Sequence, residues 1–177
     1  MIKKTLTALA LSFLLFSCSQ IDELTQFNLD YDASVVISSS TVLDLPFTVI
    51  TPEIESNSES EFAVNNTKKD LIEEIVLTKL TLTITSPTDG NFDFLESTSI
   101  YISADGLDDV EIASKTNIGN GVGNFLELET SGVNLKEYVI KDNFTLKLKN
   151  VTDELITSDH HIDIHSEFFV DAKILGQ

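Results

Sequence analysis

The feature that most constrains the fold is an alternation of apolar and polar residues with a period of two, which recurs along most of the chain. The pattern is longest near the end of the sequence, where one face would carry Ile162, Ile164, Ser166, Phe168, Val170, Ala172 and Ile174. Because successive side chains of a β-strand point to opposite faces of a sheet, this segment predicts a long strand with one buried face. Phe168 and Val170 should then be buried, and Phe169 and Asp171 should face outward or lie under a loop.

Shorter segments with the same alternation follow at close spacing, separated by residues typical of turns. The predicted strands cover residues 27–37, 43–49, 76–86, 97–103, 110–114, 126–128 and 144–148, with a further short edge piece at 61–64. Pro46 places the second segment at a sheet edge, because proline cannot donate a hydrogen bond to a neighbouring strand. Residues 66–75 are predicted to be helical, with Thr67 as the cap and Leu71, Ile72 and Ile75 as the apolar stripe. Residues 135–140 are predicted to form a short helical turn.

About eight or nine strands joined by short turns, with one short helix, predict an all-β fold. The expected architecture is an antiparallel Greek-key β-sandwich, and a closed β-barrel is the alternative. The sequence contains no internal repeat and no second-domain boundary, so residues 26–177 are expected to form one β-sandwich domain.

The first eighteen residues follow a different pattern. Lys3 and Lys4 precede an apolar run over residues 5–16, which is too short to cross a membrane and has the length of a secretory signal. The last two residues of this run and the two after it, Leu15-Phe16-Ser17-Cys18, resemble the lipobox of bacterial lipoproteins, and Cys18 is the sole cysteine of the chain. The resemblance implies cleavage before Cys18, acylation of its thiol and of the new amino group, and hence a lipid anchor.

This resemblance divides the chain into a lipoprotein signal peptide (residues 1–17), a lipidated tether (18–25) and the sandwich (26–177). The stretch Gln20-Ile21-Asp22-Glu23 resembles the surface-export signal of Bacteroidota lipoproteins, and an ordinary acidic linker is the alternative interpretation. The implied location is the outer membrane of a Gram-negative bacterium, on the periplasmic side or at the cell surface. The expected contact with the membrane is the lipid on Cys18.

The chain is strongly acidic, since 29 Asp and Glu residues stand against 11 Lys residues and no Arg, for a formal net charge of −18. Loss of residues 1–17 would remove Lys3 and Lys4 and change this charge to −20. Such a surface is a poor partner for phosphate groups, so nucleic acid is not an expected ligand. The absence of Trp argues against an aromatic carbohydrate platform, and the composition does not choose between a protein and a glycan partner.

All three histidines lie between residues 160 and 165, within the last predicted strand. On this strand His161, Asp163, His165 and Glu167 would share the face opposite the apolar row, about 6.6–7 Å apart at successive positions. The favoured interpretation is a solvated polar face without a metal, so no cofactor is expected. The alternative is a divalent transition-metal site, because imidazole and carboxylate groups are suitable ligands.

Two acidic turns contain the oxygen ligands that Ca²⁺ prefers: Asp105, Asp108 and Asp109 around Gly106, and Asp89 and Asp93 beside Gly90. Neither turn has the spacing of an EF-hand, and Asp and Gly are also what tight turns require. A calcium site is therefore not expected at either turn.

Three functions are compatible with these residues. The leading one is a non-enzymatic interaction or structural domain, anchored in the cell envelope through Cys18. The second is a metal-binding protein or metal-dependent enzyme that uses His161, Asp163 and His165. The third is a carrier that holds a small apolar ligand among its eleven phenylalanines.

Overall fold

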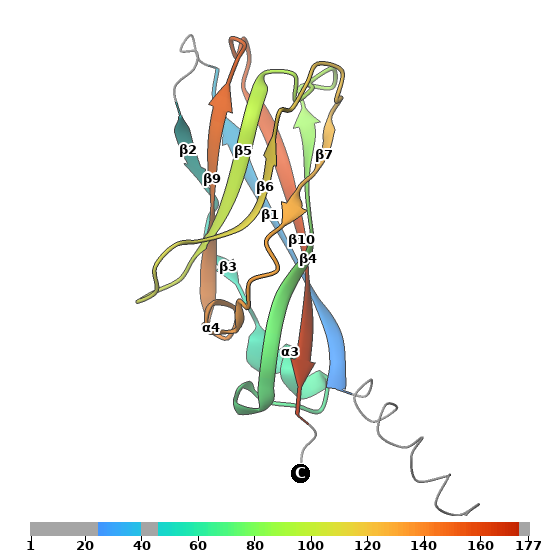
Figure 1. Cartoon of the computed structure of the whole chain (residues 1–177), viewed down its shortest axis with the longest axis vertical. Helices are drawn as coiled ribbons and strands as arrows, with labels where there is room; N and C mark the ends of the chain where they lie inside the picture. The colour runs from blue at the N-terminus through green and yellow to red at the C-terminus, as the bar shows by residue number, and fades with distance from the viewer. Residues whose placement is uncertain (1–24, 40–45, 174–177) are drawn as a thin grey trace, which may run out of the picture.

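The computed structural model in Figure 1 describes residues 25–39 and 46–173, in which ten strands form two sheets packed face to face. The first sheet has the order β1 (Gln26–Ile37), β10 (His160–Ala172), β4 (Ile72–Ser86) and β7 (Phe125–Glu127). The second has the order β2 (Phe47–Ile50), β9 (Asn143–Thr152), β5 (Leu95–Ser103), β6 (Val110–Thr116) and β8 (Glu129–Thr130), with β3 (Ile54–Glu55) also paired to β9. The predicted antiparallel Greek-key β-sandwich is confirmed. Within the described residues the strands do not close into the alternative barrel.

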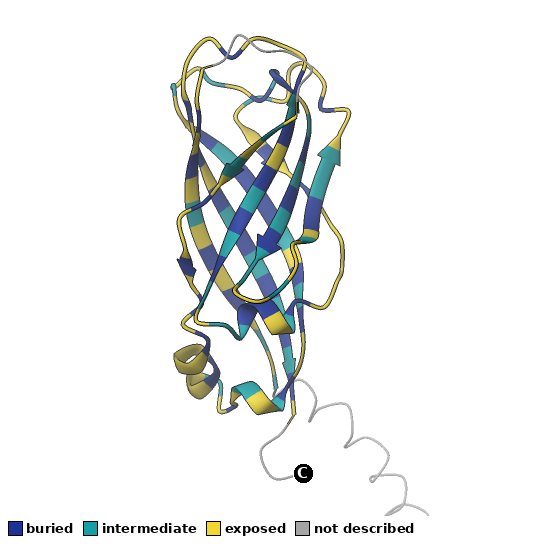
Figure 2. Cartoon of the chain, turned by 90° about the vertical axis from the view of Figure 1, so that its left-hand side faces the viewer, coloured by how far each residue is buried: buried dark blue, intermediate teal, exposed yellow. Residues whose placement is uncertain are grey.

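The alternation in the sequence separates the core from the surface. Figure 2 shows buried and exposed residues following one another along the strands. In β10, Phe168 is fully buried and Phe169 is half-buried, as the pattern predicts. At the centre of the core the rings of Tyr31, Phe144 and Phe168 meet edge to face, with centroids 5.2–6.3 Å apart. These rings fill the space between the two sheets.

β10 is regular, whereas β4 beside it is not. The pairing of the two strands shifts register three times, and each time the unpaired extra residue lies in β4, at Glu73, Thr78 and Thr85. The hydroxyl groups of Thr78 and Thr85 donate hydrogen bonds to the backbone carbonyls of Glu167 and His161. Such bulges bend a strand and allow residues of unequal spacing to share one face.

The helix predicted over residues 66–75 is wrong. This stretch contains a short 3-10 helix, η2 (Lys69–Leu71), and β4 begins at the next residue. Ile72 and Ile75 are both buried, and their spacing of three residues resembles one helical turn. In the structure the spacing arises because Glu73 is the extra residue of a bulge, so both isoleucines face the core from a strand.

The edge strand predicted at residues 61–64 is also wrong, because these residues belong to α3 (Ser58–Val64) at one end of the sandwich (Figure 1). Phe62 is fully buried, and its ring lies edge to face with that of Phe27 at a centroid distance of 6.1 Å. One large apolar anchor in seven residues is too little periodicity to separate helix from strand. The second helix, α4 (Lys136–Val139), lies where a helical turn was predicted.

Two buried threonines are expected to respond in opposite ways to replacement by valine. The Thr67 hydroxyl has no hydrogen-bond partner among the described residues, whereas that of Thr98 donates to Oδ1 of Asn150 at 2.8 Å. Thr67→Val should leave the free energy of unfolding unchanged or raise it by up to about 1 kcal/mol, because it removes an unsatisfied polar atom. Thr98→Val should lower it by about 1–3 kcal/mol, because the buried Asn150 loses its donor. Urea unfolding measures both, and equal losses would contradict this account.

Candidate functional site

The outer face of the first sheet carries the polar residues that the sequence analysis singled out. Along the outward side of β10 lie His161, Asp163, His165 and Glu167. Their partners on β1, in the same order, are Val36, Ser34, Asp32 and Asp30. The pairing therefore brings carboxylates of β1 next to His165 and Glu167. His161 and Asp163 are exposed beside uncharged partners.

His165 is the centre of the charged group on this face. Its Nδ1 lies 2.8 Å from Oδ1 of Asp32, and its Nε2 lies 3.5 Å from Oε1 of Glu167. Lys79 of β4 contacts the same Glu167 oxygen, with 3.2 Å between Nζ and Oε1. The hydrogen bond with Asp32 raises the pKa of His165, against a smaller opposing effect of burial. The hydrogen bond from Lys79 lowers the pKa of Glu167.

Three residues on this outer face, Asp30, His165 and Glu167, could hold a divalent metal ion. One ligand atom each from Asp30, His165 and Glu167 lies within 4.8 Å of the others. Asp32 favours metal binding, because a carboxylate on Nδ1 orients the imidazole and leaves Nε2 to bind the ion. Lys79 opposes it, because its ammonium group already neutralises the Glu167 carboxylate.

Two residues of the predicted metal-binding set lie outside this group of three, and one member of the group was not predicted. His161 and Asp163 are not part of the three-residue group in the portion of the chain that the structure describes. Asp30 was missed, because it becomes a neighbour of Glu167 only when the first strand pairs with the last. The alternation over residues 27–37 indicates that Asp30 faces outward. It gives no sign of which strand lies beside it.

Replacing His165 with glutamine is expected to remove a small, pH-dependent contribution to stability. A histidine whose pKa is raised by folding stabilises the fold fully below its unfolded pKa of about 6.5, and this contribution is lost as the pH rises through the folded pKa. Its side chain is 40% exposed, so the loss should stay below about 1 kcal/mol near pH 5.5 and shrink toward pH 8.5. Urea unfolding at both pH values measures it, and Asp32→Asn should show the same trend. A loss that grows with pH would refute the assignment.

The acidic turn at Asp105, Asp108 and Asp109 follows β5. Asp109 forms an ion pair with Lys147 of β9, with 2.8 Å between Nζ and each carboxylate oxygen, and this contact lowers its pKa. The backbone carbonyl of Asp108 accepts a hydrogen bond from the Tyr138 hydroxyl at 2.6 Å. Asp105 is exposed in the turn. The ion pair therefore connects the turn to β9, and the hydrogen bond connects it to α4.

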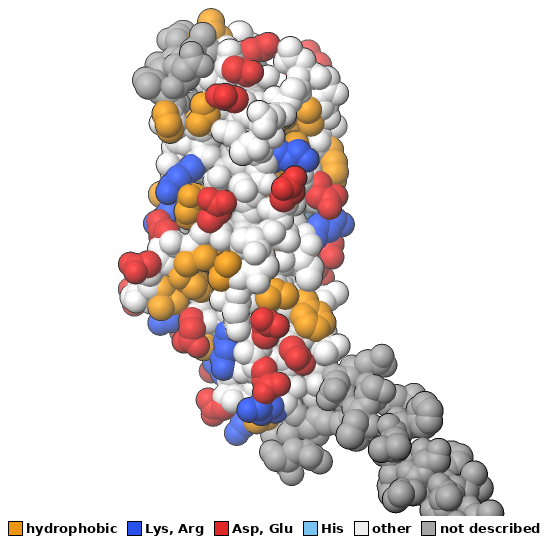
Figure 3. Space-filling view, viewed as in Figure 1, with side chains coloured by type: hydrophobic (Ala, Val, Ile, Leu, Met, Phe, Trp, Pro, Cys, Tyr) orange, Lys and Arg blue, Asp and Glu red, His pale blue; other side chains and the backbone are white. Residues whose placement is uncertain are grey.

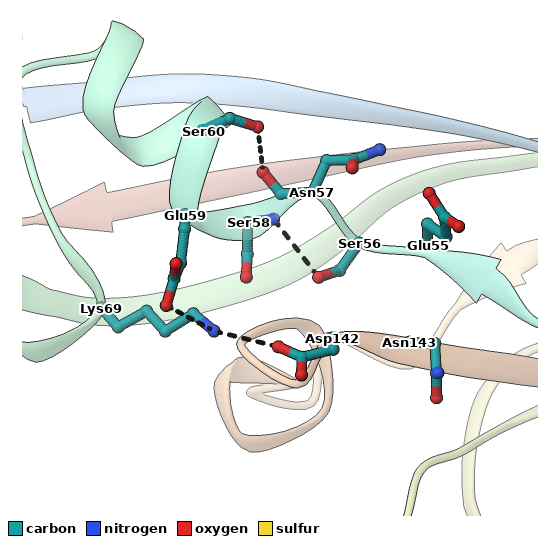
Figure 4. A pocket seen from close by; sticks show the side chains of 9 residues that line it. All are labelled: Glu55, Ser56, Asn57, Ser58, Glu59, Ser60, Lys69, Asp142 and Asn143. Carbon is teal, nitrogen blue, oxygen red and sulfur yellow. Dashed lines mark hydrogen bonds and ion pairs between the residues drawn. The ribbon is translucent and has the colours of Figure 1, made fainter.

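A surface pocket of about 420 Å³ lies beside the start of α3, and Figure 4 shows the side chains that line it. Lys69 extends across it, with Nζ 3.6 Å from a carboxylate oxygen of both Glu59 and Asp142. The backbone N–H of Ser58 donates to Oγ of Ser56 at 3.3 Å. The carboxylates of Glu59 and Asp142 thus already neutralise the charge of Lys69. Through Lys69 they connect α3 to the loop before β9.

A second hollow, the β1 groove, has a volume of about 430 Å³ and lies where the edges of the two sheets face each other. One wall is β1 at residues 30–34, and the other is the stretch 52–55, which leads from β2 into β3. Four exposed carboxylates belong to its lining, those of Asp30, Asp32, Glu53 and Glu55. The carrier hypothesis requires an enclosed apolar cavity, and this groove is open and acidic, so the groove itself does not support that hypothesis.

Comparison with known proteins assigns the chain to no family. No family model matches the sequence, and no curated protein matches it. A solved structure of the cyanophage Pam1 capsid asymmetric unit is similar, with a TM-score of 0.40 at 11% identity, over 82% of this chain and 86% of that one. For the crystal structure of FlhE the values are 0.34 at 5% identity, over 82% and 98%, and for desmodium yellow mottle tymovirus 0.29 at 13% identity, over 86% and 91%. Similarities at this level carry no argument about function.

Several sequence expectations lie outside the described residues. They concern the signal peptide, Cys18, nearly all of the tether, residues 43–45 of the second predicted strand, and Ile174. Across residues 25–39 and 46–173, no helix is both long enough and apolar enough to span a membrane. The lipid on Cys18 stays a prediction from the sequence.

Proposed function

We propose that this chain is a lipoprotein of the bacterial cell envelope, held at the outer membrane by lipid on Cys18, with a non-enzymatic interaction or structural domain. One observation carries the proposal. Cys18, the last residue of the lipobox-like Leu15-Phe16-Ser17-Cys18, stands eight residues before Gln26, where β1 begins. A signal of this kind placed directly before a rigid β-sandwich is the arrangement expected of a domain tethered to a membrane.

The tether length predicts how the sandwich would lie relative to the membrane. Gln26 at the start of β1 pairs with Asp171 near the end of β10, and this end of the sandwich also carries α3 (Figure 1). Eight extended residues reach at most about 28 Å. The end with α3 would therefore lie near the membrane, and the loops at 87–94 and 117–124 would point away from it.

The surface charge is consistent with this arrangement. Figure 3 shows acidic side chains spread over the visible face, with a few lysines among them. After signal removal the formal net charge would be −20, because Lys3 and Lys4 are lost. Anionic lipid headgroups repel such a surface, so a covalent lipid is the expected membrane contact and the flanks of the sandwich would remain accessible to partners.

Replacing Cys18 with serine tests the anchor. The variant is expected to lose labelled fatty acid and to move from the membrane fraction into soluble or unprocessed protein, because acyl chains contribute about 0.8 kcal/mol per buried CH₂ and at least two membrane signals are needed for stable anchoring. Ser17→Ala is the matched control, since it keeps a small residue before the cysteine. Detergent partitioning and fatty-acid labelling measure the result. A Cys18→Ser protein that still partitions fully with detergent at mature size would refute the proposal.

Divalent metal binding is a second candidate function, favoured by the closeness of ligand atoms in Asp30, His165 and Glu167. A bound metal stabilises a protein by mass action, by about 2.7 kcal/mol when free metal is a hundredfold above its dissociation constant. Zinc would then raise the melting temperature of the original chain and of His161→Gln, but not of His165→Gln. Lys79→Met should increase the zinc effect, because it removes the competing ammonium group. Equal melting temperatures with and without zinc in all of these proteins would exclude this function.

A further inference from the structure

We propose that the β1 groove binds an extended segment of a partner protein with basic side chains at alternate positions, which adds to the first sheet as a further strand next to β1. The inference deepens the proposed function and rests on it, because it names how an interaction domain would recognise its partner. Strand addition uses backbone hydrogen bonds for affinity and alternate side chains for specificity. The evidence comes from the edge of the sheet, the direction of its backbone groups, and the charge around them.

β1 is a long strand at the edge of its sheet. It pairs with β10 over twelve consecutive positions without a register shift. On its other side, no strand in the described part of the chain pairs with it. An edge strand of this length and regularity offers a row of unpaired N–H and C=O groups to an added strand.

Two side-chain hydrogen bonds indicate which residues of β1 direct their backbone groups outward. The carbonyls of His161 and Glu167 accept hydrogen bonds from Thr85 and Thr78 of β4, so the odd-numbered residues of β10 turn their backbone groups toward β4. In an antiparallel pair, the residues opposite them then turn their own N–H and C=O groups away from β10. By the register, these outward residues of β1 include Asp30, Asp32 and Ser34.

The same three residues line the β1 groove. The opposite wall, at residues 52–55, follows the edge of the second sheet, where Ile54 pairs with Phe144 of β9. Among the described residues, no hydrogen bond from outside the strand ladder reaches the backbone of Asp30, Asp32 or Ser34, and their own backbone groups turn away from β10. The hollow therefore lies against free backbone groups, and residues 30–34 match an added strand of about five residues, or about 17 Å.

Charge identifies the kind of segment that fits. In the described residues, the Asp30, Asp32, Glu53 and Glu55 carboxylates form no ion pair with a lysine; Asp32 contacts His165, and Glu53 accepts a hydrogen bond from Asn143. Basic side chains at alternate positions of an added strand would face these carboxylates. A second copy of β1 fits poorly, because antiparallel pairing of two β1 edges would oppose aspartates to aspartates.

Amide hydrogen exchange on the full processed chain in detergent micelles tests the proposal. The probe is a synthetic peptide of about seven residues in which lysine and valine alternate. The control peptide has proline in place of valine, which keeps the charge but prevents strand pairing. We expect the lysine–valine peptide to slow exchange at Asp30, Asp32 and Ser34 by at least about tenfold, and the proline peptide to leave it unchanged.

A pair of double variants separates the groove from general charge attraction. Glu53→Gln with Glu55→Gln should weaken peptide binding by about three- to tenfold, as expected for two exposed ion pairs. Glu127→Gln with Glu129→Gln removes the same charge from exposed positions elsewhere and should retain the affinity. Equal binding of both peptides, equal effects of both double variants, or unchanged exchange at Asp30, Asp32 and Ser34 would overturn the proposal. Protection that appears without peptide as protein concentration rises would also overturn it, in favour of self-association. Loss of anchoring in Cys18→Ser is measured separately, so the two proposals can fail independently.

Discussion

Replacing Phe168 with alanine is expected to lower the free energy of unfolding by about 3–5 kcal/mol, which is the usual cost of emptying a buried aromatic site. Phe168 is fully buried in the middle of β10, and its ring contacts those of Tyr31 and Phe144 edge to face. Its loss would leave a cavity between the two sheets that the regular pairing of β10 with β1 prevents from collapsing. Urea or thermal unfolding measures the change.

Phe169 provides the matched control, because it is the same residue type one position further along the strand. It lies on the other face of β10 and is half-buried beside Val76 and Asn28. Phe169→Ala should therefore cost roughly half as much as Phe168→Ala or less, since less apolar area is involved. Equal losses, or a greater loss at Phe169, would show that the register of the strand is wrong.

Replacing Phe62 with alanine is expected to have a similarly large effect, about 3–5 kcal/mol. Phe62 is the fully buried anchor of α3, and its ring packs on Phe27 near the start of β1. A seven-residue helix is not stable by itself, so α3 depends on this contact to remain at the end of the sandwich. Val64→Ala in the same helix should change stability by less than about 0.5 kcal/mol, because Val64 is 78% exposed. Comparable losses in the two variants would contradict the position of α3.

The parts of the fold that the sequence predicts are those in which one residue pattern covers a whole regular strand. In β1 and β10 every buried position follows the period of two, so alternation alone identifies both strands and their inner faces. At the start of β4, the residue pattern does not reveal the strand. Its bulge at Glu73 places Ile72 and Ile75 on one face at the spacing of a helix.

The candidate site is less accessible to sequence analysis than the fold. Alternation places His165 and Glu167 on the outer face of the last strand, but it carries no information about the neighbouring strand. Asp30 and Asp32 reach His165 from more than a hundred positions away in the sequence, through strand pairing alone. The β1 groove likewise depends on how two sheet edges approach each other, which no local pattern in residues 30–34 or 52–55 encodes.

The pairing of β1 with β10 has a consequence for how the chain matures. Gln26 pairs with Asp171 and Ile37 with His160, so partners in this ladder lie between 123 and 145 residues apart. Contacts this distant in sequence form slowly, because the entropy of closing a long loop opposes them. A chain that emerges N-terminus first cannot complete the first sheet until the thirteen residues of β10 arrive. If the chain is exported as proposed, it would therefore cross the export channel before this sheet has formed. If synthesis stopped before β10, both β1 and β4 would be left with open edges, and the shortened chain would be prone to aggregate.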